Sequence, residues 1–289
     1  MLHRLAVGLV TLILLGCSRE VPFVATDLTD ENRFTNNIEG PAWRDGYLYV
    51  VNFEKDGTIS RVNADGEPEL LAELPAGSTA NSIRFNSEGK MMLADFTGHN
   101  VLNLDPVDGT VSVLAHDTAF NQPNDLAINR RDQVFATDPD WKNGTGNLWR
   151  IDPDGSTHLL ADSLGTTNGI AFSPDERMLY VAESVQRIIW VYDVDDAGEI
   201  SGKRKFAEFT DYGLDGMKCD DEGNLFATRY GKGTIAMLAP DGTLLREIRM
   251  KGKNTSNLTF GGPDGRTCFV TLQDRGCVET FRVEVPGSR

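Results

Sequence analysis

Short apolar runs separated by polar turns recur along the chain from Glu39 onward. In each recurrence an anchor residue with a side-chain oxygen begins one apolar run, and a second run follows about ten residues later. A third run alternates apolar and polar residues, as in Ile59–Val62, and ends at a turn such as Asp65-Gly66. A fourth run follows the turn. The alternation and the turn residues predict four short antiparallel strands in each recurrence.

The recurrences form six repeats whose anchors are 41 to 47 residues apart. Four strands in each unit of this length are typical of a β-propeller blade. We therefore predict an all-β fold, a six-bladed β-propeller of four-stranded antiparallel blades. The sixth repeat ends after its third strand, near Val283, so we expect the N-terminal segment Pro22–Thr26 to complete the last blade and close the ring. The six anchors are Glu39, Asn81, Asn124, Asn168, Asp215 and Ser256.

An apolar stretch, Leu5–Leu15, precedes the repeats and is too short to span a bilayer. It predicts a signal peptide over residues 1–16. The following Leu14-Leu15-Gly16-Cys17 resembles the lipobox of bacterial lipoproteins, which implies cleavage before Cys17 and acylation of its thiol. Residues 17–289 would then be a single propeller domain, anchored only by lipid in the bacterial cell envelope. Ser18 favours the periplasmic face of the outer membrane, and an ordinary cleaved signal is the alternative.

The net charge of −15, from 28 basic and 43 acidic residues, argues against nucleic-acid binding. Beyond Cys17 the chain has three cysteines, an odd number, so at least one is unpaired. We expect Cys219, Cys268 and Cys277 to be buried free thiols. Nothing in the sequence indicates an oligomeric state.

The anchors also predict a binding site. Innermost strands of a propeller begin on one face beside the central channel, so the anchor side chains should converge there. They offer only oxygen, and Glu39 and Asp215 offer carboxylates. This chemistry favours one divalent cation, Ca²⁺ first, with Mg²⁺, Mn²⁺ or Zn²⁺ as alternatives. The competing explanation is that Asn, Asp and Ser begin strands because they cap turns.

Four motifs together resemble the family of gluconolactonase, regucalcin (senescence marker protein) and luciferin-regenerating enzyme. They are Glu39-Gly40-Pro41, Pro123-Asn124-Asp125, Asn168–Asp175 and Asp215-Gly216-Met217. The resemblance runs from Glu39 to the end of the chain. It implies a propeller with one catalytic divalent ion, usually calcium, that opens lactone rings. By the resemblance Glu39, Asn168 and Asp215 would be ligands, Asn124 a further ligand or a substrate contact, and Asp215 the proton donor and acceptor.

Regucalcin-type relatives often have a substrate-binding Arg two positions before Asn124, where this chain has Gln122. This departure leaves the substrate open. Loops between second and third strands should emerge on the same face as the anchors and shape the pocket, although for any single one of their residues an ordinary solvated position is the favoured explanation. The expected substrate contacts are Asn124, Gln122, Asn81, Trp141, Arg229 and Tyr230.

The predicted function is a metal-dependent lactonase in which the ion polarises the carbonyl and Asp215 acts as general base and acid. Its partner would be a small-molecule lactone or ester. Two alternatives remain. One is a hydrolase of organophosphates or other esters at the same site, and the other is a non-catalytic envelope lipoprotein with a structural ion.

Overall fold

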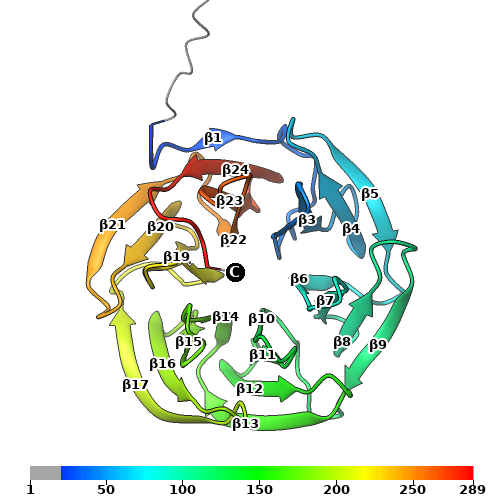
Figure 1. Ribbon diagram of the computed structural model, residues 1–289, viewed down its shortest axis with the longest axis vertical. Coiled ribbons are helices and arrows are strands. Elements are labelled where there is room, and N and C mark those ends of the chain that lie inside the picture. Colours follow the sequence, from blue (N-terminus) through cyan, green and yellow to red (C-terminus); the bar gives the residue numbers. More distant parts are fainter. Residues whose placement is uncertain (1–20, 289) are drawn as a thin grey trace, which may run out of the picture.

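A computed structural model describes residues 21–288. They form six four-stranded antiparallel sheets arranged around a central axis (Figure 1). This arrangement confirms the predicted six-bladed propeller. The predicted signal peptide 1–16 and Cys17 lie outside the described residues. Within residues 21–288 no helix is long and apolar enough to cross a membrane.

The first three blades follow one another along the chain, and the strands of each blade run in sequence order from the central axis outward. The first blade contains β2 (Ala42–Arg44), β3 (Tyr47–Val51), β4 (Thr58–Val62) and β5 (Pro68–Glu73). The second contains β6 (Ala80–Phe85), β7 (Met91–Asp95), β8 (Asn100–Leu104) and β9 (Val111–His116). The third contains β10 (Leu126–Ile128), β11 (Val134–Asp140), β12 (Thr145–Ile151) and β13 (Thr157–Leu164).

The remaining blades repeat this order. The fourth contains β14 (Thr167–Phe172), β15 (Met178–Glu183), β16 (Ile188–Val194) and β17 (Ile200–Glu208). The fifth contains β18 (Met217–Cys219), β19 (Leu225–Arg229), β20 (Thr234–Leu238) and β21 (Leu244–Arg249). The sixth contains β22 (Thr255–Gly261), β23 (Thr267–Leu272), β24 (Cys277–Arg282) and, as its outer strand, β1 (Thr26–Asp27).

The N-terminal segment closes the ring, as predicted, but its strand lies later than expected. β1 pairs with β24 through Thr26 opposite Thr280 and Asp27 opposite Glu279. Phe23, inside the predicted Pro22–Thr26 strand, has a left-handed backbone with φ of 63°, which interrupts an extended ladder. Its amide still donates to the carbonyl of Arg282 at 2.9 Å, so the segment runs beside β24 from that point.

The hydrophobic core lies between neighbouring blades, because each sheet is covered on both faces. One cluster joins Tyr49 and Ile59 of the first blade to Ile83 and Leu93 of the second. The same arrangement recurs around the ring, which explains why both faces of the inner strands are apolar. Cys219, Cys268 and Cys277 are buried in it as free thiols, as predicted.

Candidate functional site

Five of the six anchors line one cavity at an end of the central axis. Its volume is about 270 Å³. The anchors lie at or just before the start of the innermost strands, so the propeller brings together residues more than 170 positions apart in sequence. The five are Glu39, Asn81, Asn124, Asn168 and Asp215.

The sixth anchor, Ser256, does not line this cavity, so the predicted ring of six oxygens is corrected to five. The Ser256 hydroxyl is fully buried and donates to the carbonyl of Ile38 at 2.9 Å. That bond joins the sixth blade to the segment that leads into the first, so the oxygen is used to close the ring.

Residues that directly follow second strands complete the cavity wall. Phe96 follows β7, Ser184 follows β15, Tyr230 follows β19 and Gln273 follows β23, and all four line the cavity together with Trp141. Trp141 and Tyr230 were predicted as substrate contacts, and Ser184 and Gln273 lie in the loops 183–187 and 273–275 that were expected to shape the pocket, whereas Phe96 was not predicted. The signal that finds Phe96 is the common register of these residues, one residue after the second strand of the repeat.

Two predicted substrate contacts lie away from the cavity. Arg229 is the last residue of β19, and successive strand residues point to opposite sides, so it faces away from the side that Tyr230 faces. It is 0% exposed and pairs with Asp211 at 2.7 Å and Glu247 at 3.3 Å. Gln122 is not among the lining residues, and its backbone amide donates to Asp138 at 2.6 Å.

The position of Arg229 predicts a role in stability. Its guanidinium lies 3.7 Å from the ring centre of Phe209 as well as pairing with the two carboxylates. We expect Arg229→Met to lower the free energy of unfolding by about 2 kcal/mol, below the usual cost of breaking a buried pair because both carboxylates reach solvent. Urea denaturation measures this change. Arg204→Met, at a half-exposed pair, should cost under about 0.5 kcal/mol, and equal losses in both variants would contradict the prediction.

Buried hydroxyl and carboxyl groups fix the backbone under the anchors. The Thr137 hydroxyl of β11 donates to the carbonyl of Asn168 at 2.6 Å, and that of Thr228 in β19 donates to the carbonyl of Ser256 at 3.1 Å. Asp138 accepts the backbone amides of residues 121 and 122 and the indole N–H of Trp149. The two hydroxyl bonds tie the backbone of Asn168 and Ser256 to the preceding blade, and the Asp138 bonds hold the segment that leads into Asn124.

Two buried carboxylates and two partnerless amide oxygens meet in the cavity. Glu39 and Asp215 are 2% and 9% exposed. Burial is the main cause that raises the pKa of Glu39 to about 8 and the pKa of Asp215 well above its usual range, and the negative charge of Glu39 adds to the shift at Asp215. Asn124 Oδ1 and Asn168 Oδ1 are buried without a hydrogen-bond donor. This donor set fits a divalent cation that prefers oxygen, because the ion would satisfy all four groups.

The raised carboxyl pKa values predict a pH dependence for the metal-free protein. In the unfolded chain Glu39 releases its proton above its ordinary pKa of 4.5, whereas in the folded chain it holds the proton up to about 8. Between these values the folded state holds more protons, so raising the pH favours unfolding. We expect the melting temperature in chelator to fall from pH 5.5 to pH 8.5, and Ca²⁺ to restore it most at the higher pH.

The control for this prediction is Glu39→Gln, which removes one of the two carboxyls. Its melting temperature in chelator should depend less steeply on pH than that of the unmodified protein. Parallel pH curves for the two proteins, measured by scanning calorimetry, would show that Glu39 does not carry the effect.

A second acidic cluster lies at the outer edge of the ring. Asp27, Cys277 and Glu279 have ligand-type atoms within 4.8 Å of one another. Arg275 pairs with Asp27 and with Glu279, and Lys251 also pairs with Asp27. Because the protein's own cations already neutralise these carboxylates, the channel cavity is the better site for a metal ion.

Comparison with known proteins gives consistent matches. Residues 38–274 match the family described as SMP-30/Gluconolactonase/LRE-like region. A gluconolactonase from Zymomonas mobilis is 33% identical, with 81% of this chain and 75% of that protein covered. A pentonolactonase from Haloferax volcanii is 29% identical, with 81% and 80% covered. The solved structure of a gluconolactonase from Xanthomonas campestris has a TM-score of 0.77 and 26% identity, covering 91% of this chain and 89% of that one.

Proposed function

Since the chain belongs to the SMP-30/gluconolactonase/LRE-like family, as its anchor motifs predicted, we propose that it is a lactonase that uses one divalent cation. The relatives named gluconolactonase and pentonolactonase support the reaction. The observation that carries the metal requirement is the meeting of two buried carboxylates with two partnerless amide oxygens.

Glu39, Asn168 and Asp215 would hold the cation, and Asn124 would be a fourth ligand or a contact for the substrate. Ca²⁺ is the first candidate because all four groups bind through oxygen and the two carboxylates become anionic when they hold a cation, and Mg²⁺, Mn²⁺ and Zn²⁺ follow. When bound, the ion supplies a Lewis acid for the carbonyl oxygen of the lactone.

Asp215 is the general base and acid of the proposed reaction. Its carboxylate takes a proton from water while the water oxygen forms a bond to the carbonyl carbon of the lactone. The bond from that carbon to the ring oxygen then breaks, and the ring oxygen takes the proton back from Asp215. One water is consumed and one hydroxy acid is formed.

The lining residues favour an uncharged substrate. Among the described residues that line the channel cavity, none is Lys, Arg or His. Position 122 carries an uncharged Gln, and Arg229 is not among the lining residues, so neither position supplies the cation that a phosphorylated or sulfonated lactone would need. Three of the lining side chains are aromatic, and they offer apolar surface to one face of a ring.

The test is an add-back assay on protein that begins at Ser18. The protein is stripped with chelator, given one divalent ion at a time, and assayed with glucono-δ-lactone, an unsubstituted γ-lactone, 6-phosphogluconolactone and paraoxon. We expect activity only with metal, and at least ten-fold faster opening of uncharged lactones than of the phosphorylated one. Turnover of paraoxon alone would favour the ester-hydrolase alternative. Metal that raises the melting temperature without turnover of any compound would favour a non-catalytic envelope protein.

We also propose that Cys17 is acylated and holds the propeller at the cell envelope. The lipobox-like Leu14–Cys17 segment supports this localisation. Cys17→Ser should move the protein from the membrane fraction to the soluble fraction, and an unchanged distribution would refute the anchor.

A further inference from the structure

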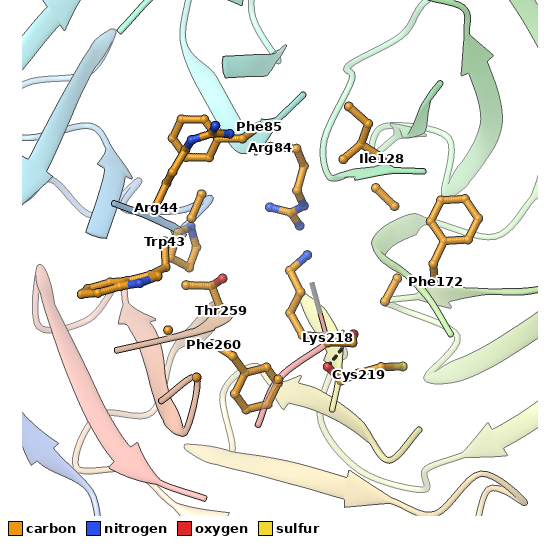
Figure 2. A pocket seen from close by; sticks show the side chains of 18 of the residues that line it. Trp43, Arg44, Arg84, Phe85, Ile128, Phe172, Lys218, Cys219, Thr259 and Phe260 are labelled. Atoms are coloured by element: carbon orange, nitrogen blue, oxygen red, sulfur yellow. Dashed lines mark hydrogen bonds between the residues drawn. The ribbon is translucent and has the colours of Figure 1, made fainter. Parts of the chain in front are cut away.

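The other end of the central axis carries a larger cavity of about 670 Å³ (Figure 2). The same innermost strands reach both ends. In β6, Asn81 lines the channel cavity and Arg84 lines this far cavity. In β14, Asn168 lines the first and Phe172 the second. The far cavity is therefore a separate site, reached from the opposite face of the propeller.

Four aromatic side chains form rigid apolar walls in the far cavity. Each is partly buried and rests on a ring from the neighbouring blade, with ring centres 5.0 to 5.1 Å apart. One of the four stacks on its neighbour and the other three meet theirs edge to face, and the Arg44 guanidinium also lies 5.3 Å from the ring centre of Phe85. These contacts hold the rings in place while part of each still lines the cavity. The four are Trp43, Phe85, Phe172 and Phe260.

Two cations lie in the middle of these walls. Figure 2 shows the side chains of Arg84 and Lys218 pointing toward one another. The Arg84 side chain is 9% exposed, and its Nε has no hydrogen-bond acceptor. The structure shows no hydrogen bond and no ion pair for the Lys218 ammonium among the described residues. Burial and the charge of Arg84 lower the pKa of Lys218 to about 7.

The carboxylates near the far cavity are already paired with arginine side chains. Asp125 binds Arg84 at 2.8 Å, and its carboxylate also accepts the Ser82 hydroxyl at 2.7 Å. Glu176 and Asp45 line the cavity, but they pair with Arg130 and Arg44. The Lys218 ammonium, when protonated, therefore has no counter-ion among the described residues, and a buried unpaired charge is costly, which agrees with its lowered pKa.

We propose that the far cavity binds a small carboxylate with an apolar body. The carboxylate accepts from the Lys218 ammonium, since charge-assisted bonds to a carboxylate are strong, and the adjacent Arg84 guanidinium adds electrostatic attraction. The apolar body packs against the aromatic walls. The single surplus charge favours a monovalent carboxylate over phosphate.

Calorimetric titration with benzoate tests this proposal. In chelator, the full propeller should bind benzoate, and Lys218→Met should weaken the binding at least ten-fold. Lys205→Met, the same change at an exposed lysine on β17, should leave it unchanged. Benzamide, which has the same ring without the charge, should bind at least ten-fold more weakly than benzoate.

Four outcomes would overturn the proposal. They are no binding of benzoate by the unmodified protein, undiminished binding by Lys218→Met, equal binding of benzamide, and inorganic phosphate binding as tightly as benzoate. Asp215→Asn should bind benzoate normally, because that residue lines only the channel cavity. Loss of binding in this variant would be a fifth overturning outcome, since it would place the anion at the proposed catalytic site. Lys218→Met should melt no lower than the unmodified protein, which separates lost recognition from lost folding.

Discussion

Replacing Asp215 by Asn is expected to abolish lactone opening while the propeller stays folded. The amide has nearly the same shape as the carboxylate, but it cannot take a proton from water and it is a weaker ligand for a divalent ion. Loss of a general base alone costs about 10²- to 10⁴-fold in rate, so kcat should fall at least about 1,000-fold. Initial rates with glucono-δ-lactone at saturating Ca²⁺ measure the change.

The melting temperature of this variant in chelator is also predicted. Asp215 is buried, and the negative charge of Glu39 raises its pKa. In chelator, Asp215→Asn removes that repulsion, so its melting temperature should equal or exceed that of the unmodified protein at pH 8. Asp193→Asn, at an exposed position on β16, is the matched control and should keep full activity. Activity above a tenth of the starting value in Asp215→Asn would refute the assigned role.

Replacing Gly169 by Ala is expected to damage the site through the backbone. A Cβ at position 169 would lie 2.0 Å from the carbonyl oxygen of Asp215 and 3.1 Å from Cα of Gly216. Backbone atoms cannot yield as a flexible side chain can, so either Asn168 or Asp215 must move. A displacement near 1 Å costs about 100-fold in rate, and we expect kcat to fall by about that factor and metal affinity at least ten-fold.

The matched control for this substitution is Gly213→Ala, just before Asp215. A Cβ there would meet its nearest atom, the Ser184 hydroxyl, at 3.4 Å, which is ordinary contact. This variant should keep at least half of the activity. Both variants are compared by calorimetric metal titration and by lactone assays. Normal metal affinity in Gly169→Ala would show that the close contact of position 169 with the Asp215 backbone does not position the metal ligands.

Much of the fold could be predicted because a propeller is built from a repeated local pattern. Each repeat carries its own alternation and its own turns, so the strands of one blade are visible without knowledge of the others. The spacing of six anchors, such as Asn124 and Asn168, gave the blade number. The short sixth repeat predicted closure by the N-terminal segment. Five anchors share one cavity because every blade starts at the same end of the axis.

Several features of the site depend on contacts that no local pattern reports. Arg229 and Tyr230 are adjacent, yet only Tyr230 lines the cavity, since a shift of one residue in a strand reverses the direction of the side chain. β1 begins at Thr26, later than the predicted start at Pro22, and Phe23 between them has a left-handed backbone.

The sequence by itself determined the repeats, the oxygen-bearing anchors and the family motifs, because these are properties of residues close together in the chain. Tertiary structure alone decided which of the predicted side chains face a cavity and which face away. The Ser256 hydroxyl of the sixth blade donates to the carbonyl of Ile38, just before the first blade, and Arg84 faces Lys218 across the axis. Those contacts join residues from different blades, and only the curvature of the assembled ring sets the distances between them.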